Sequence, residues 1–137
     1  MSAGEGRKID HVGIAVESIE KARAFYEEVL GLPFGGIEEV PDQGVRVAFF
    51  QAGEVRIELL EPLGEDGPVA RFLKKRGPGI HHLAFRTGDL EGTAALAGEK
   101  GIRLLDEKPR RGAHGTRILF LHPKDTGGVL AELCGDP

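Results

Sequence analysis

The sequence predicts an α+β fold of two βαβββ modules, whose curved, mixed sheets pair around a shared concavity. Two observations support this prediction. The strand-like stretch at 9–16 is repeated at 80–87, at an offset of 71 positions from His11 to its counterpart His82. A βαβββ unit of about 60 residues has a sheet that it cannot cover on both faces, so two units are expected to pair.

The chain has the size of one compact domain. Its 137 residues are 40% hydrophobic and 29% charged, which is ordinary for a soluble globular protein. We expect a single domain over 8–133, built of module one at 8–63, a connector at 64–79 and module two at 80–134. A polar N-terminal tail at 1–7 precedes it.

Each module opens with a strand and a helix. In module one, Ser18 follows the strand and can cap the first turn of a helix with its side-chain oxygen, and Gly31 suits a left-handed stop at the other end. Asp89 and Gly101 hold the same places in module two. The first helix has a regular apolar face, formed by Ile19, Ala22, Phe25, Val29 and Leu30.

Three further strands follow each helix, with Gly, Pro and Asp clusters supplying the turns. In chain order these strands are expected at 32–40, 44–51, 54–61, near 102–105, at 116–122 and at 129–134. Between the modules, 67–76 is expected to form a short helix. Pro68 suits its first turn, and Gly77-Pro78-Gly79 suits its end.

Composition argues against several classes of function. The formal net charge of −4 shows no basic excess, so we expect no nucleic-acid partner. No stretch of 18 apolar residues is present, so we expect no membrane span. Cys134 is the only cysteine, which argues against a disulfide or a cysteine-rich zinc site. The polar N-terminus favours a cytoplasmic location, and the lack of Asn and Trp indicates a thermophilic source.

The repeat places two histidines at equivalent positions. Strand residues alternate between faces, so His11 lies opposite the apolar residues Val12 and Ile14. By the same alternation, His82 lies opposite Leu83. We therefore expect both imidazoles to face the concavity.

Two glutamates follow the same symmetry. Glu58 and Glu132 are isolated acids inside otherwise apolar strands, 74 residues apart. A buried carboxylate needs a cation, a donor or a raised pKa. Two imidazoles and two carboxylates would form a mixed N/O shell suited to Co²⁺, Mn²⁺, Fe²⁺, Ni²⁺ or Zn²⁺. A lone strand histidine or glutamate is more often structural, and it is the duplication that favours a metal site.

The repeated pattern resembles the vicinal oxygen chelate superfamily, which includes glyoxalases and bleomycin resistance proteins. Within it, the chain is similar to the methylmalonyl-CoA epimerase family from Lys8 to Leu133. The stretches around His11 and Glu58 are shared across the superfamily. More specific to the epimerases are Glu61-Pro62-Leu63 and the segment from His122-Pro123-Lys124-Asp125 to Glu132-Leu133.

The resemblance implies a metal-dependent homodimer that acts on a small acyl-CoA, interconverting (R)- and (S)-methylmalonyl-CoA through a metal-stabilised enolate. Cobalt is the metal we expect first. The family's metal ligands fall on His11, Glu58, His82 and Glu132. Glu132 is the expected acid/base and Glu58 its partner on the opposite face. Many family members carry a second glutamate base where this chain has Val47.

Several other polar residues are candidates for substrate contacts. His114 lies in a glycine-rich loop and Lys124 in the turn after His122, and either can contact substrate or belong to a plain turn. The basic runs Lys74-Lys75-Arg76 and Arg110-Arg111 would suit the phosphates of CoA, although such runs are usually solvated surface. His81 points away from His82 and is expected to be structural.

Three other functions remain open. A glyoxalase-type isomerase uses similar ligands, and two histidines with one carboxylate also form the iron site of ring-cleaving Fe(II) dioxygenases. A metal-free binding module is a third possibility, against which the full ligand set argues.

Overall fold

The computed structural model describes residues 7–137, so the expected tail at 1–7 lies outside the described residues except for Arg7. By its internal contacts the chain divides into two compact units, one over His11–His81 and one that joins His82–Pro137 to the chain up to Asp10. Within the described range, no helix is long and apolar enough to cross a membrane.

The first module follows the expected order of elements. It comprises β1 (Lys8–Ala15), α1 (Ile19–Ala24) with a π-helical turn at Phe25–Val29, β2 (Phe34–Val40), β3 (Val45–Ala52) and β4 (Val55–Pro62). These strands are ordered β2-β3-β4-β1, and β1 runs parallel to β4 while the other pairs are antiparallel. The expected strands are confirmed, with ends that differ by one or two residues.

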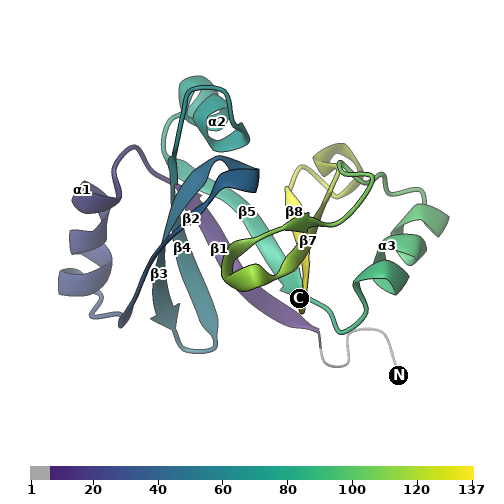
Figure 1. The fold of residues 1–137 in the computed structure, drawn as a ribbon, viewed down its shortest axis with the longest axis horizontal. Coiled ribbons are helices and arrows are strands. Elements are labelled where there is room, and N and C mark those ends of the chain that lie inside the picture. Colours follow the sequence, from purple (N-terminus) through teal and green to yellow (C-terminus); the bar gives the residue numbers. More distant parts are fainter. Residues whose placement is uncertain (1–6) are drawn as a thin grey trace. The chain divides into compact units, whose positions relative to one another are not determined.

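Local signals explain where the first helix begins and ends. The Ser18 hydroxyl accepts a hydrogen bond from the Lys21 backbone N–H at 3.2 Å, as expected of an N-cap. Gly31 adopts a left-handed φ of +68° just after the helical turns. The helix packs on one face of its sheet (Figure 1), over a core of Val16, Ile19, Ala48, Phe50 and Leu59.

The second module repeats this arrangement. It comprises β5 (Gly79–Arg86), α3 (Leu90–Glu99), β6 (Arg110–Arg111), β7 (Arg117–Leu121) and β8 (Ala131–Gly135). The strand order is β5-β8-β7-β6, equivalent to that of module one, and only β5 and β8 are parallel. The prediction of two mixed-sheet βαβββ modules is therefore confirmed.

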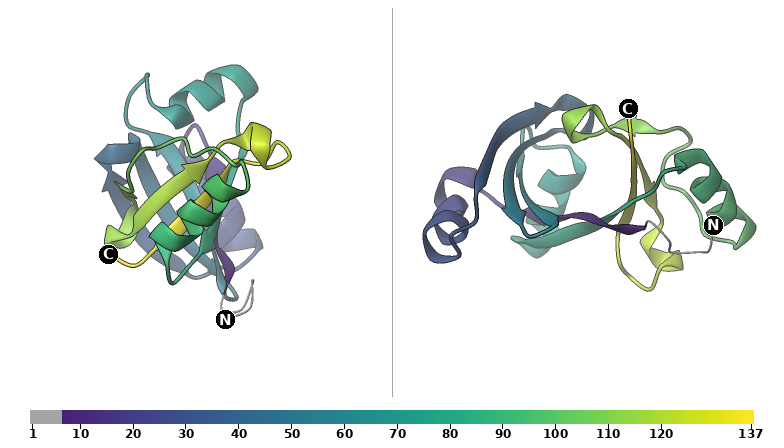
Figure 2. Two further views of the ribbon diagram at one scale, coloured as in Figure 1. Left: turned by 90° about the vertical axis from the view of Figure 1, so that its right-hand side faces the viewer. Right: turned by 90° about the horizontal axis from the view of Figure 1, so that it is seen from below.

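The helix of the second module is also capped as expected. The Asp89 carboxylate accepts from the Gly92 backbone N–H at 3.0 Å, and Gly101 has a left-handed φ of +81°. The right-hand view of Figure 2 shows α3 alongside β8. The buried residues between helix and sheet are Leu90, Ala97, Leu119, Leu121, Ala131 and Leu133.

The connecting helix α2 spans Pro68–Arg76, close to the predicted 67–76. Pro68 begins it, where a missing N–H costs nothing. Gly77 ends it with a left-handed φ of +78°, and its N–H donates to the Leu73 carbonyl at 2.9 Å.

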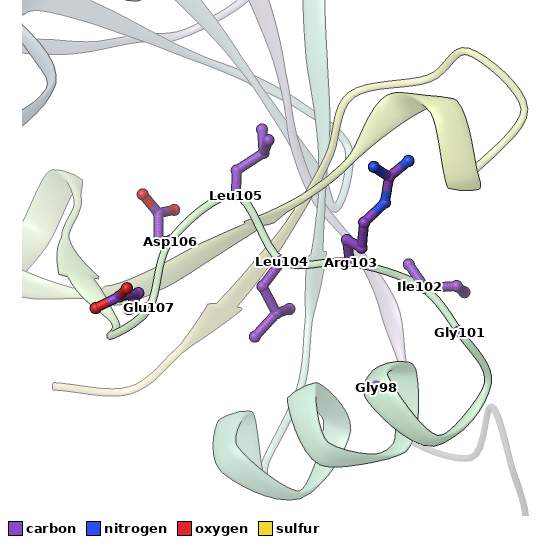
Figure 3. Close-up of a pocket in the computed structure, with 8 residues that line it drawn as sticks. All are labelled: Gly98, Gly101, Ile102, Arg103, Leu104, Leu105, Asp106 and Glu107. Carbon is purple, nitrogen blue, oxygen red and sulfur yellow. The ribbon is translucent and has the colours of Figure 1, made fainter.

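The prediction of a strand near 102–105 is wrong in part. Leu104 forms only an isolated bridge with Leu121, and the edge strand of this module is the two-residue β6. The Asp106 carboxylate accepts from the Phe120 N–H at 3.2 Å and so occupies a donor that a longer strand would use. Figure 3 shows this segment with its side chains pointing in different directions, around a shallow hollow beside α3.

Candidate metal centre

The first histidine–glutamate pair lies on the two parallel strands of module one. Glu58 on β4 is in register with Gly13 on β1, and Gly13 is two residues from His11. The side chains of His11 and Glu58 therefore lie on the same sheet face, the one away from α1. The His11 Nδ1 and Glu58 Oε2 atoms are 3.3 Å apart. The two residues are only 5% and 3% exposed.

The second pair repeats the first. Glu132 on β8 is in register with Ala84 on β5, two residues from His82. The His82 Nε2 and Glu132 Oε1 atoms are 3.4 Å apart, and the residues are 4% and 2% exposed. Within each module, the expected pairing of one imidazole with one carboxylate is therefore present.

The donor chemistry of these pairs fits a divalent cation. Each module supplies one imidazole nitrogen and one carboxylate oxygen from a buried face, a donor set that suits borderline divalent metals. A carboxylate at 2–3% exposure also needs positive charge or hydrogen bonds to be stable. The sharing of one ion by all four residues stays a prediction.

Three residues of these faces were missed by the sequence reasoning. Arg56 precedes Glu58 by two residues and therefore shares its face, and its Nη2 lies 3.1 Å from Glu58 Oε2. Phe49 on β3 is the cross-strand neighbour of Glu58, and Phe120 on β7 is that of Glu132. The 71-residue repeat relates the two phenylalanines, which is the signal that could have identified them.

The phenylalanines make each face partly aromatic. The Phe120 ring meets His82 edge to face, with ring centroids 5.5 Å apart and planes at 89°. The imidazole of the second pair thus packs against an aromatic ring. Phe49 is 4% exposed.

Val47 lies on the same face of β3 as Phe49. It is 2% exposed and opposes Leu60 across the strands. At Val47, module one therefore has a buried apolar side chain and no acid/base group.

His81 and His122 take part in packing and turns. The His81 ring packs edge to face against Phe72 of α2, with centroids 5.1 Å apart, and burial lowers its pKa to about 4. His81 is thus neutral near pH 7. The His122 Nδ1 accepts from the Lys124 backbone N–H at 3.2 Å and caps the turn at Pro123–Asp125.

The two proposed substrate contacts, His114 and Lys124, lie on turns of module two. His114 is exposed and has the left-handed φ of +59°, which is unusual for a residue with a side chain. Lys124 is exposed on a turn held by Asp125, whose carboxylate accepts from the Arg103 backbone N–H at 2.9 Å and from its Nε at 2.8 Å. Arg103 also holds the pKa of Asp125 well below its usual range.

Some residues of the two basic runs make contacts within the fold. The Lys74 ammonium donates to the Glu65 carbonyl at 2.9 Å, and Arg110 lies 3.6 Å from the Asp106 carboxylate. Contact of these runs with phosphate stays a prediction.

Comparison with known proteins places this architecture in a family. The family model described as Glyoxalase/Bleomycin resistance protein/Dioxygenase superfamily matches residues 10–120. Among curated proteins, the uncharacterized protein YqjC of Bacillus subtilis is 51% identical over 127 residues, covering 93% of this chain and 91% of YqjC. The mitochondrial methylmalonyl-CoA epimerase of Bos taurus is 46% identical, covering 92% of this chain and 73% of that protein.

Solved structures show the same likeness. A variant of the Streptomyces coelicolor methylmalonyl-CoA epimerase, in complex with 2-nitronate-propionyl-CoA, matches with a TM-score of 0.90 and 42% identity over 94% of each chain. The chain therefore has the vicinal oxygen chelate fold that its family resemblance implied.

Proposed function

We propose that this chain is a metal-dependent epimerase of (R)- and (S)-methylmalonyl-CoA. It belongs to the Glyoxalase/Bleomycin resistance protein/Dioxygenase superfamily, and it is similar to the methylmalonyl-CoA epimerases of that superfamily. The observation that carries the proposal is the duplicated, buried pair of one imidazole and one carboxylate. The substrate class rests on the relatives, among which a structure holds an acyl-CoA analogue.

The proposed metal site consists of His11, Glu58, His82 and Glu132. When bound, a divalent cation supplies a Lewis acid that draws electron density from the substrate's carbonyl and carboxylate oxygens. Co²⁺ is the ion we propose first, with Mn²⁺, Ni²⁺, Zn²⁺ and Fe²⁺ as alternatives, because N/O donors accept all of them.

The proposed acid/base groups are the carboxylates. The hydrogen on the α-carbon lies between a thioester and a carboxylate, and its removal leaves a planar enolate. Glu132 takes that proton onto a carboxylate oxygen, and return of a proton to the opposite face inverts the centre. Glu58 is the proposed donor on that face, because Val47 offers no proton.

Two groups outside the strands are proposed to bind the substrate. The Lys124 ammonium, exposed on a turn fixed by Arg103 and Asp125, suits an anionic group of the acyl-CoA. His114, held in a left-handed turn, is the second proposed contact.

Exchange of the α-hydrogen with solvent tests this function. Metal-stripped protein is incubated with methylmalonyl-CoA in D₂O, and divalent ions are added back singly. We expect deuterium at the α-carbon with at least one ion and none without metal. His82→Gln should abolish the exchange, whereas His81→Gln, the adjacent structural histidine, should retain it.

Failure of exchange with every ion would contradict the proposal. Oxygen consumption with a catechol would then favour a dioxygenase, and turnover of a glutathione adduct would favour a glyoxalase-type isomerase.

A further inference from the structure

Arg56 makes two hydrogen bonds to Glu58, one of the proposed metal ligands. Its Nη2 and Nε atoms lie 3.1 and 3.3 Å from Glu58 Oε2. The Arg56 side chain is 22% exposed and that of Glu58 is 4% exposed, so this ion pair is largely withdrawn from solvent. An ion pair with two donors fixes the orientation of a carboxylate more firmly than a single contact does.

The contacts of Glu58 fall on one oxygen. The His11 Nδ1 atom, at 3.3 Å, approaches the same Oε2 that Arg56 contacts. Oε1 is therefore the oxygen that this arrangement presents to a cation. A carboxylate held in this way would coordinate through one oxygen and could not rotate to offer both.

The second module has no counterpart of this arginine in its strand. The residue two positions before Glu132 is Leu130, which carries no charge. In its own module, Glu132 lies beside His82, which approaches its Oε1 atom at 3.4 Å. The duplicated half-sites therefore differ in chemistry although their backbones are equivalent.

We propose that Arg56 is a positioning residue, which orients Glu58 so that this carboxylate binds the metal through Oε1 alone. The inference rests on the proposed function, since it takes Glu58 to be a ligand. Hydrogen bonds from outside the ligand shell commonly set the affinity of a metal site, and their loss costs about 10–100-fold in metal affinity.

Metal binding by Arg56 variants tests this role without any measurement of turnover. We expect Arg56→Leu, which copies the residue at position 130, to bind Co²⁺ at least about 10-fold more weakly in calorimetric titration of metal-free protein. The visible absorption of the bound Co²⁺ should also change, because the Glu58 carboxylate is free to reorient. Arg56→Lys should restore part of the affinity.

Arg46→Leu is the matched control. Arg46 lies on the neighbouring strand β3 and pairs with Glu39 and Glu61 at 3.4 and 3.7 Å, so its loss should leave Co²⁺ affinity unchanged. If Arg56→Leu does not fold, as judged by circular dichroism, Arg56→Gln replaces it in the comparison with Arg56→Lys.

Each outcome separates the two proposals. If Arg56→Leu binds Co²⁺ with the affinity and absorption spectrum of the unaltered protein, the positioning role is overturned. The epimerase proposal is then unaffected. An unaltered protein that binds no divalent ion would overturn the metal-dependent function, and the role of Arg56 with it.

Discussion

The burial of the Glu58 and Glu132 carboxylates lowers the stability of the fold unless they have partners. A carboxylate buried in an apolar sheet is stable only beside cations or donors, and removal of its partner leaves an uncompensated charge. Each acid has an imidazole within 3.4 Å, and Glu58 has Arg56 as well. These partners stabilise the two acids in an otherwise apolar setting, which is expected where the acids serve a site.

The exchange of Glu132 for glutamine tests its proposed part in proton transfer. Glu132→Gln keeps the size of the side chain and an oxygen that can bind metal, but it removes the base. We expect α-hydrogen exchange to fall at least about 100-fold, as is typical for loss of a general base. The far-ultraviolet circular dichroism should be unchanged. Full retained exchange would show that another group removes the proton.

The pKa of His81 predicts a pH dependence of stability. Burial lowers this pKa from 6.5 to about 4, so between these values the unfolded chain binds a proton that the folded chain does not. The free energy of unfolding should therefore fall as pH decreases through this window, by at most about 1.4 kcal/mol per pH unit from this group. Above pH 6.5, His81 contributes no pH dependence.

Urea unfolding of metal-free protein between pH 4 and pH 7 measures this effect. His81→Phe keeps a ring to pack on Phe72 and has no titrating group. Its free energy of unfolding should depend less steeply on pH than that of the unaltered protein. Parallel profiles for the two proteins would show that His81 does not titrate as described.

At the scale of elements, the two N-caps predict similar losses of stability. Ser18 and Asp89 each accept a backbone N–H at the start of a helix, at 3.2 and 3.0 Å. Ser18→Ala and Asp89→Ala should each lower the free energy of unfolding by about 1 kcal/mol. Ser18→Asp and Asp89→Asn retain a capping oxygen and should lose little. Equal stability of the Ala and capping variants in urea unfolding would contradict these roles.

The elements were predictable where a local signal was strong. Caps, left-handed glycines and alternating apolar residues identified the helices and most strands. The edge strand of module two was not predictable from the apolar run Ile102, Leu104 and Leu105. There the Arg103 N–H donates to Asp125 and Asp106 accepts from the Phe120 N–H, so side chains take part of the hydrogen bonding that a longer strand would use.

For the whole molecule, we expect a homodimer. Three large apolar side chains near the end of the first helix are exposed, with Phe25 at 51%, Val29 at 71% and Leu30 at 50%. Apolar groups gathered in this way are often covered by a partner. Light scattering of the purified protein should give twice the 14.7 kDa of one chain. A mass of one chain at micromolar concentration would contradict this expectation.

The duplication also explains how much of the candidate site could be predicted. Residues that the repeat relates by type, the two histidines and two glutamates, were found by symmetry alone. Arg56 was not, because its counterpart is Leu130 and the repeat gives no signal there. Contacts that break the symmetry depend on side-chain geometry, which the pattern of residue types does not contain.

We propose that one imidazole and one carboxylate from each module bind the same ion. Anomalous diffraction at the cobalt absorption edge, from crystals of the Co²⁺-loaded protein, would locate that ion. We expect a single cobalt site per chain, with His11, Glu58, His82 and Glu132 as its protein ligands. A cobalt ion held by the pair of one module alone, or no cobalt at either pair, would contradict it.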